Sequence, residues 1–409
     1  MSFGIALTGI DAAQTNLDVV SNNIANSDTT GFKQSVAQFS NLYAGGENGV
    51  AADSVGNGVQ VSQIAQDFTQ GPMQTTGNNL NLAISGQGFF VVSTGGALSY
   101  TRAGDFSTNA AGAVVNPQGQ ALQVYAPTGN GGFNTSTTTS LTISSADSPP
   151  LATQNVGLTL NLPANATPPV NAFNPTDATS YNNSTTATVY DSLGAAHTST
   201  VYFSQVSPNN WNADMTVDGV QQGAAVPIAF SASGALTAPA GPPLGVINFG
   251  AYTPTTGANA MNLNFNLAKT TQYGDSFAVN AITQDGQTTG TMSGINIATS
   301  GVVEAQYTNG QSVQLGQVAL ANFADPNGLA QQGNSDWAQT AASGAALNGQ
   351  AGSAGLGQVE SGSLEGSNVN VTAALVAMIS AQRAFQANAQ MISTQNQITQ
   401  TVIQIPTQG

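Results

Sequence analysis

His197 is the only histidine among the 409 residues, so any histidine-based catalytic or metal site would have to include it. A single imidazole excludes zinc sites built from several histidines, and the sequence contains no HExxH motif. A Ser-His-Asp triad would need His197, yet no GxSxG nucleophile elbow occurs. Because His197 follows a predicted turn and begins a predicted strand, we interpret it as an ordinary hairpin residue.

The other residue types offer no recognisable active site. Nineteen acidic residues form many accidental pairs, but none lies in a glycosidase motif. Gly86-Gln87-Gly88 lacks the third glycine of a dinucleotide fingerprint and precedes strand residues, so it predicts a turn. No GK[ST] phosphate loop is present. We therefore expect no catalytic, cofactor-binding or metal-binding residues, and we do not expect an enzyme.

Charge and composition exclude several classes of partner. Charged residues make up only 6% of the chain, and its net charge is −15. Four scattered cations cannot form the basic surface that nucleic acid or an anionic membrane requires. The absence of cysteine excludes disulfides and thiolate metal sites. No apolar run approaches the ~18–20 residues of a membrane span, and Lys33 is the first basic residue, so a cleaved secretory signal is not expected.

Seven-residue apolar repeats occupy both ends of the chain. They predict one helix from Ser2 to about Ser27, and another that starts near Ser367–Asn370 and ends near Ile403. An apolar stripe of this period can be buried only against another helix. A single pair of helices would still leave other helix faces without a partner, which favours packing between subunits. The candidate subunit-interface residues are the repeat positions Phe3, Ile10, Leu17, Ile24, Val371, Met378, Phe385 and Ile392.

The roughly 300 residues between the repeats are β-rich and punctuated by turns. Residues 41–60 are predicted to be a loop or extended arm, and the small, Gly-rich residues 341–366 are expected to contribute little to a core. Hairpin turns are predicted at Asp191-Ser192-Leu193-Gly194, Asp218-Gly219, Asp285-Gly286 and Asn309-Gly310.

Motifs at both ends resemble those of bacterial flagellar rod and hook proteins. The C-terminal run from Ile379 to Gln390 (ISAQRAFQANAQ) is similar to the signature that these axial proteins share. Leu80–Ile84 with Gly86–Phe90 resembles the first strands of the domain that follows their terminal helices. The N-terminal resemblance lies in Leu7-Thr8-Gly9-Ile10, Asn22-Asn23-Ile24-Ala25-Asn26 and Thr29-Thr30-Gly31-Phe32-Lys33.

Within this family, the runs 189–197 and 316–323 and the long insert resemble the hook members more than the shorter distal rod proteins. The resemblance implies a multidomain α+β fold whose terminal helices pair as a coiled-coil-like inner domain, with two β-rich domains inserted between them. The implied parts are a helical inner polymerisation domain (1–30 and 368–409), a connecting arm (31–80 and 361–367), a β-rich middle domain (81–148 and 285–360) and a β-rich outer domain (149–284).

The function implied by the resemblance is that of a structural subunit, which self-assembles into a curved, flexible tube coupling the rotating rod to the filament. The implied partners are further copies of the chain, the distal rod protein, the hook cap protein, the hook–filament junction protein and the flagellar type III export apparatus. Neither nucleic acid, membrane insertion nor a cofactor is expected. The implied location is the extracellular flagellum. The alternatives are another flagellar axial protein, of the distal rod or the hook–filament junction, and more distantly a secreted β-rich adhesin.

Overall fold

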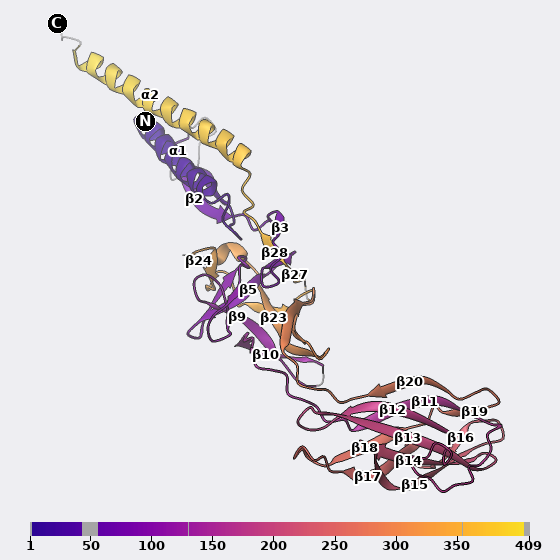
Figure 1. The fold of residues 1–409 in the computed structure, drawn as a ribbon. Coiled ribbons are helices and arrows are strands. Elements are labelled where there is room, and N and C mark those ends of the chain that lie inside the picture. The colour runs from indigo at the N-terminus through magenta and orange to yellow at the C-terminus, as the bar shows by residue number, and fades with distance from the viewer. Residues whose placement is uncertain (1, 43–55, 130, 354, 405–409) are drawn as a thin grey trace. The chain divides into compact units, whose positions relative to one another are not determined.

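The computed structural model describes residues 2–42, 56–129, 131–353 and 355–404, which divide into two compact units (Figure 1). Unit 1 comprises Met1–Ser144, Gly294–Ala305 and Ser312–Gly409, and unit 2 comprises Ser145–Ser293 and Gln306–Gln311. The chain is mostly β-sheet, with one long helix near each terminus. This coarse part of the predicted fold class is confirmed.

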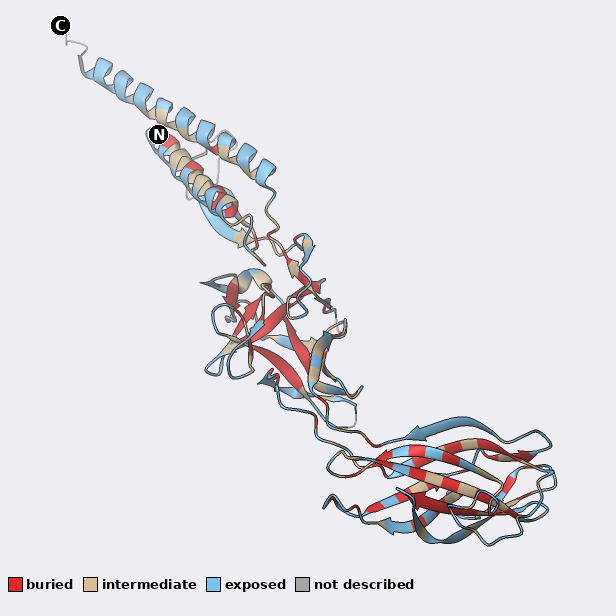
Figure 2. Cartoon of the chain, viewed as in Figure 1, coloured by how far each residue is buried: buried red, intermediate tan, exposed pale blue. Residues whose placement is uncertain are grey.

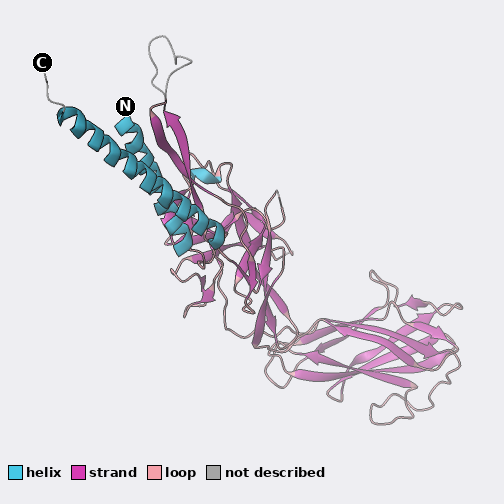
Figure 3. Ribbon diagram, turned by 90° about the horizontal axis from the view of Figure 1, so that it is seen from above, coloured by secondary structure: helices cyan, strands magenta, loops and turns pink. Residues whose placement is uncertain are grey.

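Both terminal helices form where the repeats predict them. Helix α1 spans Ser2–Ala25 and helix α2 spans Val371–Gln404. The side chain of Asn370 accepts a hydrogen bond from the backbone N–H of Ala373 at 3.1 Å, so the predicted cap is present. The two helices lie side by side in unit 1 and run in opposite directions, as the views in Figures 1 and 3 agree.

A β-hairpin packs against α1, where the sequence predicted a loop or extended arm. Strands β1 (Ser35–Leu42) and β2 (Gly58–Gln66) are antiparallel, so both ends of the 41–60 segment belong to strands, and residues 43–55 lie outside the described residues. Asn23 of α1 binds this hairpin through both side-chain atoms, donating to Ser35 O at 2.7 Å and accepting from Ser35 N at 2.9 Å. The prediction of a loop is therefore corrected only at residues 41–42 and 58–60, whose Gly, Asn and Ala-rich surroundings conceal the strand pairing in the sequence.

A twelve-stranded sheet makes up most of the rest of unit 1. Its core includes Phe89, Tyr100, Phe323 and Trp337, and the rings of Phe89 and Trp337 meet edge to face with centroids 5.5 Å apart. The strands are β5 (Phe89–Thr94), β6 (Ala97–Thr101), β7 (Ser107–Thr108), β8 (Val114–Val115), β9 (Ala121–Pro127), β10 (Phe133–Ser140), β21 (Met292–Ile297), β22 (Val302–Tyr307), β23 (Ser312–Asn322), β24 (Ala330–Gly333), β25 (Asp336–Ala338) and β26 (Leu347–Gln350).

The Gly-rich segment 341–366 contributes to the core, contrary to the prediction. Strand β27 (Gln358–Ser361) pairs with β4 (Leu82–Ser85), and β28 (Ser363–Glu365) pairs with β3 (Met73–Thr75). Val359 is fully buried. A Cβ at Gly357 would lie 2.5 Å from the carbonyl oxygen of Ser85, so the small residues allow close strand approach rather than weakening the packing.

Unit 2 is built from two five-stranded sheets that share one apolar core, shown in red in Figure 2. Along β13 buried and less buried residues alternate, and Val201 and Phe203 face inward. The first sheet contains β12 (Asn183–Tyr190), β13 (Ala196–Ser207), β14 (Asn210–Val217), β15 (Val220–Phe230) and β16 (Leu236–Ala238). The second contains β11 (Asn155–Pro163), β17 (Val246–Tyr252), β18 (Met261–Asn266), β19 (Thr271–Tyr273) and β20 (Ala278–Gln284).

Three of the four predicted hairpin turns are confirmed, and the fourth is wrong. The turns near residues 191, 218 and 309 join β12 to β13, β14 to β15 and β22 to β23. Asp285, in contrast, directly follows β20, which pairs with β11 instead of the following β21. Its side chain accepts the backbone N–H groups of Gln154 (2.8 Å) and Asn155 (3.0 Å). The Asp-Gly pair therefore stabilises a long-range crossing rather than a local turn.

Candidate assembly surface

Small residues form the buried seam of α1. Ala6, Ala13 and Val20 are spaced seven apart and are buried, as is Ala381 on α2. A Cβ at Gly9 would lie 2.8 Å from the side-chain nitrogen of Asn388, so the absence of a side chain at this position allows the helices to approach closely. Small residues thus allow the close approach of the two helices at this point.

The eight predicted interface residues all lie on the two paired helices. Six of them (Ile10, Leu17, Ile24, Met378, Phe385 and Ile392) are half-buried in a single copy. Phe3 and Val371, at the first positions of the two stripes, are exposed by 47% and 41%. The structure therefore brings the repeats together on the two paired helices, and their contact with neighbouring subunits remains a prediction.

Helix α2 also exposes an apolar surface that the repeat analysis missed. Leu375, Val376 and Ile379, here called the outer α2 patch, are 46%, 60% and 50% exposed. Leu375 and Ile379 are four residues apart, a spacing that places them on the same face of a helix. They are not part of the seven-residue stripe, which marks a different set of positions. A compact apolar patch on a charge-poor helix indicates a surface that another molecule covers.

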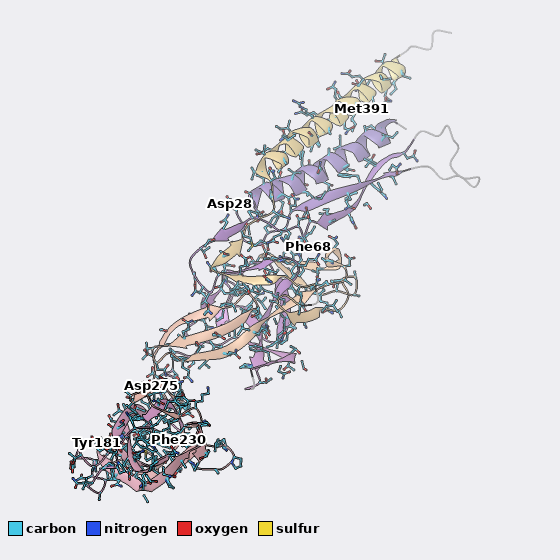
Figure 4. The ribbon with its side chains drawn as sticks, turned by 90° about the vertical axis from the view of Figure 1, so that its right-hand side faces the viewer. Asp28, Phe68, Tyr181, Phe230, Asp275 and Met391 are labelled. Carbon is cyan, nitrogen blue, oxygen red and sulfur yellow. The ribbon has the colours of Figure 1, made fainter. Side chains whose placement is uncertain are left out.

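A second exposed patch lies farther along α2. Gly9 of α1 faces Asn388, and α1 begins only seven residues earlier, so the antiparallel pair ends near residue 395 of α2. Met391, labelled in Figure 4, lies close to this end, and Ile398 and Val402 lie beyond it. All three are exposed and make up the distal α2 patch. The last turns of α2 therefore have no cover from α1.

A buried ion cluster joins the two chain ends to the sheet of unit 1. The Glu365 carboxylate accepts hydrogen bonds from Lys33 Nζ at 2.6 Å, Arg102 at 3.1 Å and the backbone N–H of Gly71 at 2.9 Å. Lys33 also donates to the carbonyl of Thr69 at 2.7 Å. The side chains of Lys33 and Glu365 are completely buried. We call Lys33, Arg102 and Glu365 the Glu365 cluster.

The Glu365 cluster is structural rather than catalytic in its chemistry, because each charge is committed to another group. Burial lowers the pKa of the Lys33 and Arg102 cations, and attraction to Glu365 offsets only part of this effect. Arg102 also donates to the carbonyl of Gly86 at 2.8 Å, and its guanidinium carbon lies 5.6 Å from the Phe89 ring centroid. In the sequence the two cations are isolated charges, and no local signal pairs either of them with Glu365.

His197 belongs to a second charged cluster, in unit 2. Its Nδ1 lies 2.6 Å from an Asp218 carboxylate oxygen, and its Nε2 lies 3.3 Å from one of Asp191. Asp218 also accepts from the Tyr252 hydroxyl (3.1 Å), and Asp191 from the Thr256 hydroxyl (2.8 Å). The cluster thus connects the first sheet to β17 and to the loop that follows it. His197 is a hairpin residue, as predicted, but the prediction missed its two acidic partners.

The pH dependence of unit 2 should follow His197. Burial alone would lower the pKa of the imidazole, but hydrogen bonds to Asp218 and Asp191 outweigh it and raise the pKa above 6.5. Burial alone would raise the pKa of the two carboxyls, but hydrogen bonds outweigh it and lower the pKa of both, chiefly the bond from Thr256 at Asp191 and the bond with His197 at Asp218. We therefore expect unit 2 to lose about 1 kcal/mol of unfolding free energy as the pH rises from about 6 to about 9, allowing for solvent screening at the partly exposed Asp218.

Trp211, buried in unit 2, gives the readout for this prediction once Trp337, the only other tryptophan, is replaced by Phe. Denaturation followed by Trp211 fluorescence should show the pH dependence, and His197→Gln should flatten it. Equal pH profiles for the two proteins would show that His197 is neutral in the folded state.

Neither cluster is a metal centre. Among the residues described, no group of three or more His, Cys, Asp or Glu side chains is arranged to hold a metal ion. Within the same set, neither long helix is apolar enough over a sufficient length to cross a bilayer. The features that remain for function are the exposed patches of the helix pair and the surfaces of the β-sheets.

Four segments of the chain match families of flagellar proteins. Residues 3–33 match the family described as flagella basal body rod protein, and residues 360–405 match the flagellar basal body rod FlgEFG protein C-terminal family. Residues 83–168 match the flagellar hook protein FlgE/F/G D1 domain, and residues 161–287 match the flagellar basal body protein FlaE D2 domain.

Full-length relatives and one solved structure agree with these matches. The flagellar hook protein FlgE of Salmonella typhimurium is 39% identical over 419 residues, covering 99% of this chain and 100% of its own length. The FlgE protein of Escherichia coli is 38% identical over 416 residues, with the same coverage. The crystal structure of Helicobacter pylori flagellar hook protein FlgE2 is similar in fold, with a TM-score of 0.51 at 13% identity, covering 70% of this chain and 99% of that one.

Proposed function

The chain belongs to the flagellar hook protein family and is a structural subunit of the flagellar hook, and we propose that it assembles there by polymerising through its two terminal helices. The observation that carries this proposal is the distribution of apolar residues on the helix pair. Its seam is made of small residues, while the outer and distal α2 patches are exposed in a single copy. Packing against neighbouring copies would remove both patches from water.

In this proposal α1 and α2 form a coiled-coil-like inner domain, and the eight repeat positions from Phe3 to Ile392 contribute to the contacts between subunits. Residues 31–80 and 361–367 act as a connecting arm, residues 81–148 and 285–360 as a middle domain, and residues 149–284 as an outer domain. The inner helices resist twisting and so transmit torque from rod to filament, whereas the β-rich domains shift against their neighbours as the tube bends.

The charge-poor surface supports a joint that bends. Only 6% of the residues are charged, so the contacts between β-rich domains would be made largely by amides, hydroxyls and bridging water. Such hydrogen bonds can exchange partners at a low cost in free energy, whereas extensive apolar surfaces would hold neighbouring domains in one fixed arrangement. Exposed ion pairs would add little, because water and salt screen them.

The proposed partners follow the order of a flagellum. The subunit leaves the cell through the flagellar type III export apparatus without cleavage of a signal peptide, and it adds to the growing tube beneath a hook cap protein. One end of the tube meets the distal rod protein, and the other meets the hook–filament junction protein. Membership of the hook family supports these partners and the extracellular location.

Electron microscopy of the purified chain tests the proposal. Under polymerising conditions we expect short, curved tubes, because subunits along the inner and outer sides of a bend differ in spacing but keep the same helix contacts. Straight rods would favour another axial protein, and a persistent monomer at high concentration would count against the proposal.

A substitution in the outer α2 patch should separate folding from assembly. Ile379 is half exposed in one copy, so Ile379→Asp should leave the monomer's melting temperature nearly unchanged. In the polymer it would bury an unpaired carboxylate, which should raise the concentration required for tubes by about tenfold or more. Ile379→Met, which keeps the site apolar, is the matched control and should polymerise normally. Sedimentation of both variants checks the difference, and equal behaviour would remove this patch from the interface.

A further inference from the structure

Strand β20 is the most exposed strand of unit 2. All seven residues of Ala278–Gln284 are exposed, and Figure 2 shows the strand in pale blue along its length. On one side β20 pairs with β11, from Asn161↔Ala278 to Val156↔Gln284. On its other side, no strand among the described residues pairs with it. One edge of its backbone is therefore free to form hydrogen bonds.

This edge lacks the features that normally prevent strand addition. The strand sequence AVNAITQ contains no charge, proline or glycine, and Val279 and Ile282 expose apolar side chains. Lysine, proline or a covering loop is the common protection of an exposed edge. The edge of β17, in contrast, is shielded, because the backbone of Phe249 lies against Gly223 of β15. Unlike β17, β20 thus presents an edge that can accept another strand.

We propose that β20 pairs edge to edge with a strand in the outer domain of a second copy of this chain. The inference rests on the polymer proposed above, in which every subunit is surrounded by copies of itself. Each copy carries a net charge of −15, so copies of the chain approach one another with least repulsion through uncharged surfaces such as this strand. Asp275 and Asp285 lie outside the two ends of the strand, and the residues between them, 276–284, are all uncharged.

The geometry of a helical polymer determines the type of pairing. Subunits along a tube point in the same direction, so their contacts are heterologous and β20 cannot pair with the β20 of its neighbour about a two-fold axis. The partner is therefore a different strand edge of the next copy. Main-chain hydrogen bonds are largely independent of side-chain identity. When one strand slips by two residues along its partner, its side chains point to the same faces of the sheet as before. Such a contact can re-form in a new register after neighbouring subunits shift.

Cysteine labelling tests the proposal directly, because the chain contains no cysteine of its own. Val279→Cys and Ile282→Cys place one thiol each on β20, and Val220→Cys places a matched thiol at the exposed first position of β15 in the other sheet. Maleimide should label all three readily in the monomer. In tubes we expect labelling to slow by about tenfold at positions 279 and 282 but not at position 220. Unchanged rates on β20, or equal slowing at all three sites, would overturn the inference.

A pair of proline variants gives a second, independent readout. The N–H groups of consecutive strand residues point to opposite edges, so one of Ala281→Pro and Ile282→Pro removes a donor from the β11 ladder and the other removes one from the free edge. The variant that keeps the monomer's melting temperature should need about tenfold more protein to form tubes. Normal assembly of that variant would contradict strand pairing. Tubes with β20 fully labelled would refute this inference alone, whereas failure of the unmodified chain to polymerise would refute the proposed function as well.

Discussion

Glu365→Ala is expected to lower the free energy of unfolding of unit 1 by roughly 3–5 kcal/mol. The substitution leaves the Lys33 ammonium, whose side chain is fully buried, and the nearly buried Arg102 guanidinium without their shared carboxylate. It also removes the acceptor of the Gly71 N–H. A buried charge without a partner is far more costly than a lost surface contact, and folded domains have only about 5–15 kcal/mol of stability in total.

The measurement is denaturant unfolding followed by Trp337, which is buried in unit 1, in a Trp211→Phe background. Glu360→Ala is the matched control, because Glu360 lies on neighbouring β27 and is only half-buried. It should cost less than about 1 kcal/mol. Glu365→Gln keeps an acceptor without the charge and should fall between the two. If Glu365→Ala and Glu360→Ala had equal effects, the cluster would not hold the chain ends to the sheet.

Phe385→Asp is expected to block polymerisation without unfolding the β-rich parts of the chain. Phe385 is half-buried beside the helix seam, on the stripe that includes Met378 and Ile392. In a tube of packed helices an aspartate there would bury an unpaired carboxylate, at a cost of several kcal/mol for each subunit. Because every added subunit carries that cost, the concentration needed for growth should rise by about a hundredfold or more.

Gln386→Asp introduces the same charge at the next residue, which is exposed, and provides the control. It should form tubes near the normal concentration. Sedimentation and electron microscopy measure assembly, while the Trp211 and Trp337 unfolding transitions should stay unchanged in both variants. Normal tubes from Phe385→Asp would show that Phe385 faces solvent, and the predicted register of the repeats would have to be abandoned.

Local patterns predicted the elements whose causes are local. The seven-residue repeats predicted both helices, and Asn370 was recognised as a possible cap because capping depends on neighbouring residues. The turn at Asp218-Gly219 was equally predictable, since both residues adopt the positive φ angles, 50° and 80°, that a tight hairpin turn requires. The same reasoning failed at Asp285-Gly286, where a contact with Gln154 and Asn155 replaces the local turn.

By itself, the sequence determined the terminal helices, most of the turns and the absence of recognisable catalytic motifs, because each depends on residue types within a few positions of one another. Only the tertiary structure decided which charges meet and which apolar residues stay exposed. Lys33 and Glu365 are separated by 332 positions, and the partners of His197 come from two different turns. Whether Ile379 is covered depends on the reach and direction of α1, and whether β20 has a free edge depends on the order of strands in the sheet. Such contacts depend on packing between segments that are distant in the sequence. Local periodicity and turn-forming residues do not predict them.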